Sequence, residues 1–195
     1  TRPFGFEGAR RARVASEGIE KLREATDATL VIPNQVLLDR LDSSVSLSQS
    51  YHYADEVLAN GVRGVAELVT RGGEVNLDFA DIKSLLRDAG TAMMGVGCAA
   101  GTDRARAAAR EAIACPFLES RSIQSAKAVL VNVRAGSDFL LHELDDVMDV
   151  VRENVASDAE MLFGHVVDDE CGGEISVTVI ATGFDLSPDD VGTEL

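Results

Sequence analysis

The stretch that decides the fold is YHYADEVLANGVRGVAELVT at residues 51–70, followed by RGGEVNLDFAD at residues 71–81. The apolar side chains of the first segment recur at steps of three or four residues, at Ala54, Leu58, Val62, Val65 and Val69. Because this spacing places them on one helix face and no proline interrupts it, we expect one amphipathic helix about 30 Å long. The glycine pair that follows is typical of a helix end.

The residues before this helix predict a shorter, incomplete unit. Val14, Ile19 and Leu22 lie at helical spacing among charges within residues 7–25. A short apolar run at residues 29–32 follows and ends at a Pro-Asn pair. This pattern predicts a helix, then a buried strand, then a turn.

The residues after the helix predict a complete α/β unit. Asp78 is a candidate N-cap for a short helix that runs to about Arg87. Strand patterns at 93–96, 128–133, 161–167 and 175–181 then alternate with helical patterns at 103–114 and 140–155, and a hairpin-like turn occupies 168–173. We therefore expect the α/β class, as a two-layer domain with a mixed four-stranded sheet and helices packed on it.

The composition excludes several classes of partner. The 195 residues include 18 Lys+Arg and 33 Asp+Glu, which gives a net charge of −15. Such a surface repels nucleic acid and anionic lipid, so we expect neither nucleic-acid binding nor direct membrane binding. The three cysteines are widely spaced and no apolar run approaches the ~20 residues that span a bilayer. We therefore expect a cytoplasmic protein without a metal site of its own, and the opening at Thr1 rather than Met indicates a piece of a longer protein.

The segment NLDFAD contains the most specific group of polar residues, Asn76, Asp78 and Asp81. Two carboxylates and an amide on a short loop before a helix can orient and polarise a water molecule, or hold a cation. The alternative is structural: Asp78 caps the helix, and Asp81 lies in its first turn, where the helix dipole favours an acid. The spacing alone leaves both interpretations open.

The long helix and this loop together resemble the central helix and synergy loop of the FtsZ family of tubulin-like GTPases. The resemblance rests on NLDFAD after a helix of the form ADEVL…GV…GV…ELVT, and it covers nearly all of residues 1–185. In that family the loop enters the nucleotide site of the next subunit, and its acids orient the water that attacks the γ-phosphate. The resemblance implies that Asp78 and Asp81 are catalytic acids and that Asn76 supports them.

Further segments resemble the nucleotide contacts of the same family. TRPFGFEGARR at residues 1–11 is similar to the segment whose Glu and Arg contact the ribose, which implies these roles for Glu7 and Arg11. Asn34 matches the Asn that meets the guanine, and Tyr51 and Asp55 match the aromatic and the acid that hold the base. Without the resemblance, Glu7 and Arg11 are an ordinary i,i+4 pair and Asp55 is a solvated charge.

The resemblance implies four parts of the chain. Residues 1–50 are the end of a Rossmann-like GTP-binding domain, residues 51–71 are the connecting helix, residues 72–184 hold the synergy loop and a smaller α/β domain, and residues 185–195 begin a flexible tail. Two departures from the family matter. Its glycine-rich phosphate loop has no counterpart in this sequence, and the short acidic end lacks the tail peptide that division regulators bind.

The function implied is that of a GTP-dependent, filament-forming cell-division protein. It would act as a GTPase in the cytoplasm at the division site, as a head-to-tail homopolymer with GTP or GDP and Mg²⁺ at the subunit junction. One alternative is a non-catalytic module that caps or contacts the polymer. Another is a dinucleotide-binding enzyme, because GVGCAAG at residues 95–101 approximates a phosphate-binding fingerprint, although the same glycines also suit a tight strand-to-helix turn.

Overall fold

The computed structural model describes residues 1–38, 45–70, 77–118 and 123–184. Its elements follow one another along the chain as η1 (Gly5–Glu7), α1 (Ala9–Ala25), β1 (Ala28–Leu30), α2 (Asn34–Leu38), α3 (Leu47–Thr70), α4 (Phe79–Leu86), β2 (Gly90–Ala100), α5 (Arg104–Ile113), η2 (Pro116–Leu118), β3 (Ala128–Ala135), α7 (Leu141–Arg152), β4 (Glu160–Val167), η3 (Asp169–Cys171) and β5 (Glu174–Thr182). The α/β class expected from the sequence is confirmed.

Five strands form one mixed sheet in the order β1-β2-β5-β3-β4. β5 runs antiparallel to both of its neighbours, β2 and β3, whereas β1 is parallel to β2 and β4 is parallel to β3. The mixed sheet predicted from the sequence is confirmed, with five strands instead of four. The additional strand is β1, which pairs Ala28 with Gly90 and Leu30 with Ala92. The segment before the long helix therefore extends the sheet formed by the later strands.

The hairpin expected between the last two strands is wrong. β4 and β5 are not neighbours, because β3 lies between them and pairs along its length with both. Almost every residue of β3 is buried, as expected for a central strand that is covered on both faces and hydrogen-bonded at both edges. The turn residues at 168–173 show that the chain reverses, but they do not determine whether the reversed strand is adjacent.

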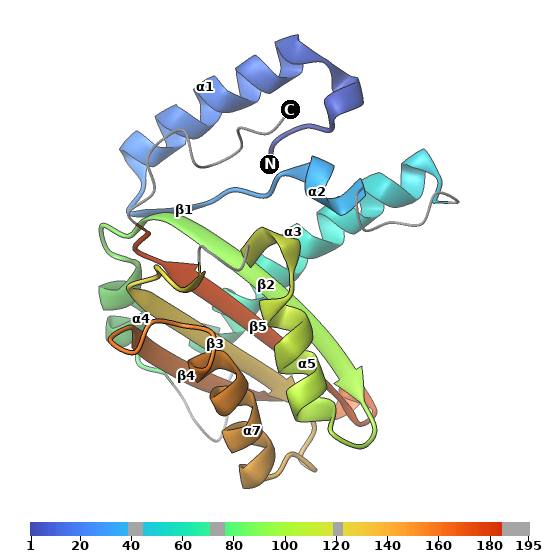
Figure 1. The fold of residues 1–195 in the computed structure, drawn as a ribbon, viewed down its shortest axis with the longest axis vertical. Coiled ribbons are helices and arrows are strands. Elements are labelled where there is room, and N and C mark those ends of the chain that lie inside the picture. Colours follow the sequence, from blue (N-terminus) through green and yellow to red (C-terminus); the bar gives the residue numbers. More distant parts are fainter. Residues whose placement is uncertain (39–44, 71–76, 119–122, 185–195) are drawn as a thin grey trace.

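Helices cover both faces of the sheet (Figure 1). α5 and α7 lie in front of it in that view, over a core that includes Val131 and Val147. α3 crosses behind the sheet, and α4 contributes Ile82 to a second core around Leu130 on that side. No helix in the described residues is both long enough and apolar enough to pass through a bilayer.

Gly95 and Gly97 serve packing, which removes the basis of the dinucleotide-binding alternative, and Gly101 lies in the turn between β2 and α5 with φ +84°. Gly95 and Gly97 lie inside β2 instead of in a loop that leads from a strand to a helix. A Cβ atom on Gly97 would stand 2.1 Å from the carbonyl oxygen of Ala108, and one on Gly95 would stand 2.0 Å from that of Ala112. The glycines therefore allow α5 to lie directly against β2, and no phosphate-binding loop is formed at these positions.

The long helix α3 is fixed against the sheet by close backbone approach. The Asn132 side chain of β3 donates from Nδ2 to the carbonyl oxygen of Gly64 at 3.0 Å. A Cβ atom on Gly64 would stand 3.1 Å from Thr178 Cγ2 of β5. Both observations place the C-terminal half of α3 directly against the central strands β3 and β5.

α3 begins at Leu47, four residues before the start expected from its apolar spacing. The reason is a capping box, in which Gln49 N donates to Ser46 Oγ at 3.3 Å and Ser46 N donates to Gln49 Oε1 at 2.9 Å. This pair satisfies two amides at the helix start, so the first turn forms ahead of the apolar stripe.

Candidate functional site

The residues predicted to contact a ribose form a rigid pair at the start of α1. Glu7 Oε2 accepts a hydrogen bond from Arg11 Nη1 at 2.6 Å, and Glu7 Oε1 accepts one from the Phe4 backbone N at 2.9 Å. The Glu7 side chain is only 8% exposed, whereas that of Arg11 is 69% exposed. Both carboxylate oxygens of Glu7 are therefore occupied inside the chain, and Arg11 is the member of the pair that reaches solvent.

Asn34 lies just after β1, where the amino-terminal segment runs alongside it. Arg2 N donates to Ile32 O at 2.8 Å and Asn34 N donates to Arg2 O at 3.0 Å, so residues 2 and 33 form a parallel bridge. The Asn34 residue is 7% exposed, and within the described residues its Oδ1 has no hydrogen-bond partner. A buried acceptor left unsatisfied costs about 1–3 kcal/mol, so a ligand that donates to this oxygen would recover that energy.

An aromatic cluster joins these residues to α3. Phe4 is 1% exposed, and its ring lies 5.1 Å from that of Phe6 in a stacked arrangement. Phe4 also meets Tyr51 in a T-shaped arrangement, with ring centroids 5.2 Å apart. Tyr51 is 37% exposed, and the exposed Asp55 follows it by one helical turn. The structure thus connects Glu7, Arg11 and Tyr51 to Phe4 and Asn34 to the bridge at Arg2, while Asp55 lies one helical turn beyond Tyr51 on α3.

The acids of the predicted synergy loop lie at the start of α4. Asp78 is the N-cap of this helix, and its Oδ1 accepts from Ala80 N at 3.3 Å. Asp81 lies in the first helical turn and is exposed. Ile82 and Leu85 anchor α4 in the core, so both acids stand on the solvent side of a fixed helix. The capping geometry predicted for Asp78 is confirmed, and Asn76 lies outside the described residues.

The two groups of predicted site residues lie at opposite ends of α3. Tyr51 and Asp55 belong to its first turns, and α4 follows its last residue, Thr70, after the segment 71–76. The 24 residues of α3 correspond to about 36 Å of helix at 1.5 Å per residue. In Figure 1, α4 lies beyond the end of α3 that is remote from α2. Asp78 and Asp81 therefore cannot reach a ligand bound at Tyr51 of the same chain.

A metal ion has no evident binding site in the described part of the chain. No group of three or more His, Cys, Asp and Glu side chains is arranged to hold one there. Of the five residues predicted to contact the nucleoside, which are Glu7, Arg11, Asn34, Tyr51 and Asp55, Arg11 is the one that carries a positive charge. We therefore assign no catalytic step to Mg²⁺.

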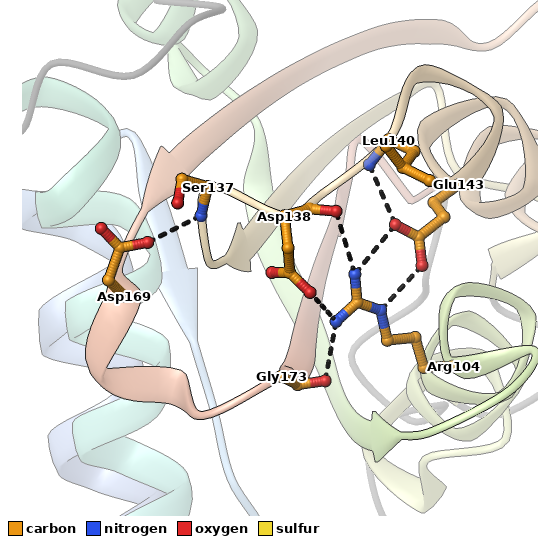
Figure 2. Close-up of polar contacts among 7 residues, drawn as sticks. All are labelled: Arg104, Ser137, Asp138, Leu140, Glu143, Asp169 and Gly173. Atoms are coloured by element: carbon orange, nitrogen blue, oxygen red, sulfur yellow. Dashed lines mark hydrogen bonds and ion pairs between the residues drawn. The ribbon is translucent and has the colours of Figure 1, made fainter.

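A polar cluster built on Arg104, the first residue of α5, was not predicted from the sequence. Arg104 Nε and Nη2 donate to the two carboxylate oxygens of Glu143 at 2.7 and 3.0 Å (Figure 2). Arg104 Nη1 donates to Asp138 Oδ2 and to Gly173 O, each at 2.8 Å, and Nη2 also reaches Asp138 O at 3.4 Å. All of the N–H groups of this guanidinium are directed at acceptors.

The Arg104 cluster connects three loops at one end of the sheet. Its acceptors come from the β3–α7 connection, the first turn of α7 and the start of β5, and a further bond from Ser137 N to Asp169 Oδ1 at 2.7 Å joins the first of these to η3. The bond from Arg104 lowers the pKa of Glu143 below its ordinary value, and the bond to Glu143 raises the pKa of Arg104. The cluster contains no residue predicted to touch a nucleotide, so its role is to hold these loops in place.

Comparisons with known proteins agree with this architecture. Residues 90–185 match the model of the FtsZ family, C-terminal domain. An empty FtsZ dimer from M. jannaschii is 34% identical to this chain, with a TM-score of 0.87 over 93% of this chain and 52% of that one. A mutant FtsZ from the same organism gives the same identity and TM-score over 94% of this chain and 55% of that one.

A more distant relative shows the fold alone. CetZ2 from Haloferax volcanii, in a GTPγS-bound protofilament, is 18% identical with a TM-score of 0.72, over 93% of this chain and 54% of that one. The chain thus spans about half the length of the structures that it matches. The family model covers the sheet from β2 onward, and the M. jannaschii structures extend the similarity through α3 and the amino-terminal residues. The chain therefore belongs to the FtsZ family and corresponds to its C-terminal portion.

Proposed function

We propose that this chain is part of a GTP-dependent, filament-forming cell-division protein and supplies catalytic acids to the GTP site of the adjacent subunit. The full-length protein would act in the cytoplasm at the division site, and division regulators would bind it through a C-terminal tail peptide that has no counterpart in this chain. The proposal is supported by membership of the FtsZ family and by the FtsZ dimer and CetZ2 protofilament among the matched structures. One geometric observation carries it, the separation of the two groups of candidate site residues by most of the length of α3.

The group around Phe4 provides one half of the proposed site, for the guanosine part of the nucleotide. The exposed face of Tyr51 stacks on the base, and the Asp55 carboxylate accepts from the N1–H and 2-amino groups that guanine offers and adenine lacks. Asn34 Oδ1, buried and without a partner in the described residues, accepts a further hydrogen bond from the ligand. Arg11, which is held by its ion pair with Glu7, contacts the ribose. The phosphates and Mg²⁺ are left to residues outside this chain.

The start of α4 provides the other half of a site, for a different nucleotide. Its acids are exposed and lie beyond the far end of α3, which runs for about 29 Å from Tyr51 to Thr70 at 1.5 Å per residue, so they act on a nucleotide held by a neighbouring subunit. Asp81 lies in the first turn of α4 and is not its N-cap, and its carboxylate orients and polarises the attacking water. Asp78 adds a second negative charge and fixes the helix start on which Asp81 stands.

This arrangement requires a polar, head-to-tail contact. The face that holds the nucleotide and the face that carries the acids are different surfaces of one chain. Each junction pairs one face of each kind, so a filament has a free nucleotide face at one end and a free acid-bearing face at the other. Contacts of this heterologous kind do not close on themselves when no rotation axis relates the subunits, and they extend into filaments.

The test uses substitutions at the two acids in the full-length protein. We expect Asp81→Ala to lower GTP turnover by ~10²- to 10⁴-fold, because a positioned acid–base group is lost. GTP affinity should change less than about twofold, because the acid serves the neighbour's nucleotide. Turnover is measured by phosphate release and affinity by titration calorimetry.

Two further variants separate catalysis from capping at Asp78. Asp78→Asn removes the charge but keeps an oxygen that can cap α4, whereas Asp78→Ala removes both. If Asp78 is catalytic, both variants lose turnover; if it is only a cap, Asn keeps turnover and Ala loses about 1 kcal/mol of stability. Asp145→Ala, which removes an exposed acid of α7, controls for net charge. Full turnover in Asp81→Ala would contradict the catalytic assignment and favour a non-catalytic polymer contact.

A further inference from the structure

Phe4 stands between the two parts of the proposed guanosine site without being exposed to a ligand. It is 1% exposed, so it cannot be a contact residue. Its ring forms a T-shaped pair with that of Tyr51, with an interplanar angle of 85°, and its backbone N donates to Glu7 Oε1 at 2.9 Å. One buried residue is thus bonded to the candidate ribose residue and packed against the candidate base residue.

The packing around Phe4 restricts how it can move. Phe6 stacks on the ring at 5.1 Å with an interplanar angle of 11°, and it is itself 59% exposed. The backbone before Phe4 is held by the bridge between residues 2 and 33. Because the ring is enclosed and the backbone is tied at both ends, Phe4 presents a fixed surface to Tyr51.

We propose that Phe4 is a positioning residue for guanosine: its ring sets the orientation of Tyr51, and its amide sets the orientation of the Glu7 carboxylate. An edge-to-face contact has a preferred angle, so it favours one orientation of the Tyr51 ring over the others that an exposed helical aromatic adopts. The hydrogen bond from the Phe4 backbone N–H holds Glu7 Oε1 and leaves Oε2 to accept from Arg11. This inference rests on the proposed function, because it assigns Tyr51 and Glu7 to nucleotide binding.

The first test compares Phe4→Leu with Phe6→Leu in the full-length protein. Leu at residue 4 keeps an apolar core side chain but cannot make the edge-to-face contact, so we expect GTP affinity to fall by ~3- to 10-fold and KM to rise equally. The kcat at saturating GTP stays within about twofold, because the acids of α4 are remote. Phe6→Leu removes the ring that stacks on Phe4 and should leave GTP affinity within about twofold of wild type. Unchanged affinity in folded Phe4→Leu would overturn the proposal.

A second measurement follows Tyr51 directly and needs no nucleotide. The chain has two tyrosines, so ¹⁹F NMR of the fluorotyrosine-labelled chain gives one signal for Tyr51 and one for Tyr53. We expect Phe4→Leu to shift or broaden the Tyr51 signal and to leave that of Tyr53 in place, whereas an unmoved Tyr51 signal would overturn the positioning role. If Phe4→Leu does not fold, Phe4→Met replaces it, with the same outcomes.

The two tests distinguish failure of this inference from failure of the proposed function. A wild-type full-length protein that binds no GTP would contradict the proposed function, and the fluorine signals would still decide whether Phe4 orients Tyr51. Wild-type GTP binding that survives Phe4→Leu unchanged would leave the proposed function intact and refute the role of Phe4.

Discussion

Replacing Arg104 with Ala is expected to destabilise the chain by about 3–4 kcal/mol, because it removes one partner of a buried ion pair. The Arg104 side chain is 10% exposed and Glu143 is 12% exposed, so neither is well hydrated in the fold. After the substitution Glu143 loses both bonds from the guanidinium and keeps the one from Leu140 N at 2.9 Å. Asp138 is 57% exposed and can return to water, so its lost bond adds little.

The magnitude is measured by urea unfolding of the wild-type and variant chains, followed by circular dichroism. For a chain of this size, 3–4 kcal/mol corresponds to a fall of about 6–16 °C in Tm. Arg104→Lys keeps the positive charge but loses the planar guanidinium, so its loss of stability should lie between zero and that of Arg104→Ala.

Arg106→Ala is the matched control on the same helix. Arg106 also bonds to an acid of α7, Asp146, but its side chain is 39% exposed, so its loss should be much smaller than that of Arg104. A loss below about 1 kcal/mol in Arg104→Ala would refute the argument that this pair is a buried structural link.

Three further predictions follow from the structure. Gly97→Ala should lower the free energy of unfolding in urea by at least ~1–3 kcal/mol, because its Cβ would meet the Ala108 carbonyl oxygen at 2.1 Å. Gly18→Ala in α1 is the control: its Cβ would meet nothing within 4 Å, so the substitution should be neutral or stabilising. The pKa of Glu143 is lower in the folded state than in the unfolded state. The ionised carboxylate therefore stabilises the fold above the unfolded-state pKa, and this stabilisation is lost as the pH falls through the folded-state pKa. The difference in unfolding free energy between wild type and Glu143→Gln should shrink on acidification from pH ~5. The isolated chain should bind GTP too weakly to detect at micromolar concentration, because its net charge of −15 opposes a polyanion and Arg11 is the single cation among the five predicted nucleoside contacts; tight binding in calorimetry would refute this.

The local elements could be read from the sequence because their signals are local. The apolar spacing of residues 54–69 predicted α3, and the turn residues after it predicted its end. Ser46 and Gln49 form a capping box with the sequence signature S-x-x-Q, and this local signal marks the start of α3 more closely than the apolar spacing does. Glu7 and Arg11 were expected to pair because they are four residues apart, and they do.

The remainder depends on neighbours that are distant in the sequence. Arg104 bonds to residues 34, 39 and 69 positions away, and no pattern around it predicts three such partners. The position of β5 between β2 and β3 is a property of the whole sheet, whereas turn residues report only a reversal of the chain. The function of Asp78 and Asp81 cannot be derived from their spacing, because a cap and a catalytic acid occupy the same place at a helix start.

The most direct test of the trans-acting role mixes two full-length variants that are each expected to be inactive. Asp81→Ala binds GTP but lacks the catalytic acid, and Asp55→Ala carries the acid but has lost its base contact. If the acid of one subunit serves the nucleotide of the next, phosphate release by the mixture should exceed the sum of the separate rates and peak near equal amounts. A rate equal to that sum, although the two proteins co-sediment as one polymer, would contradict the account.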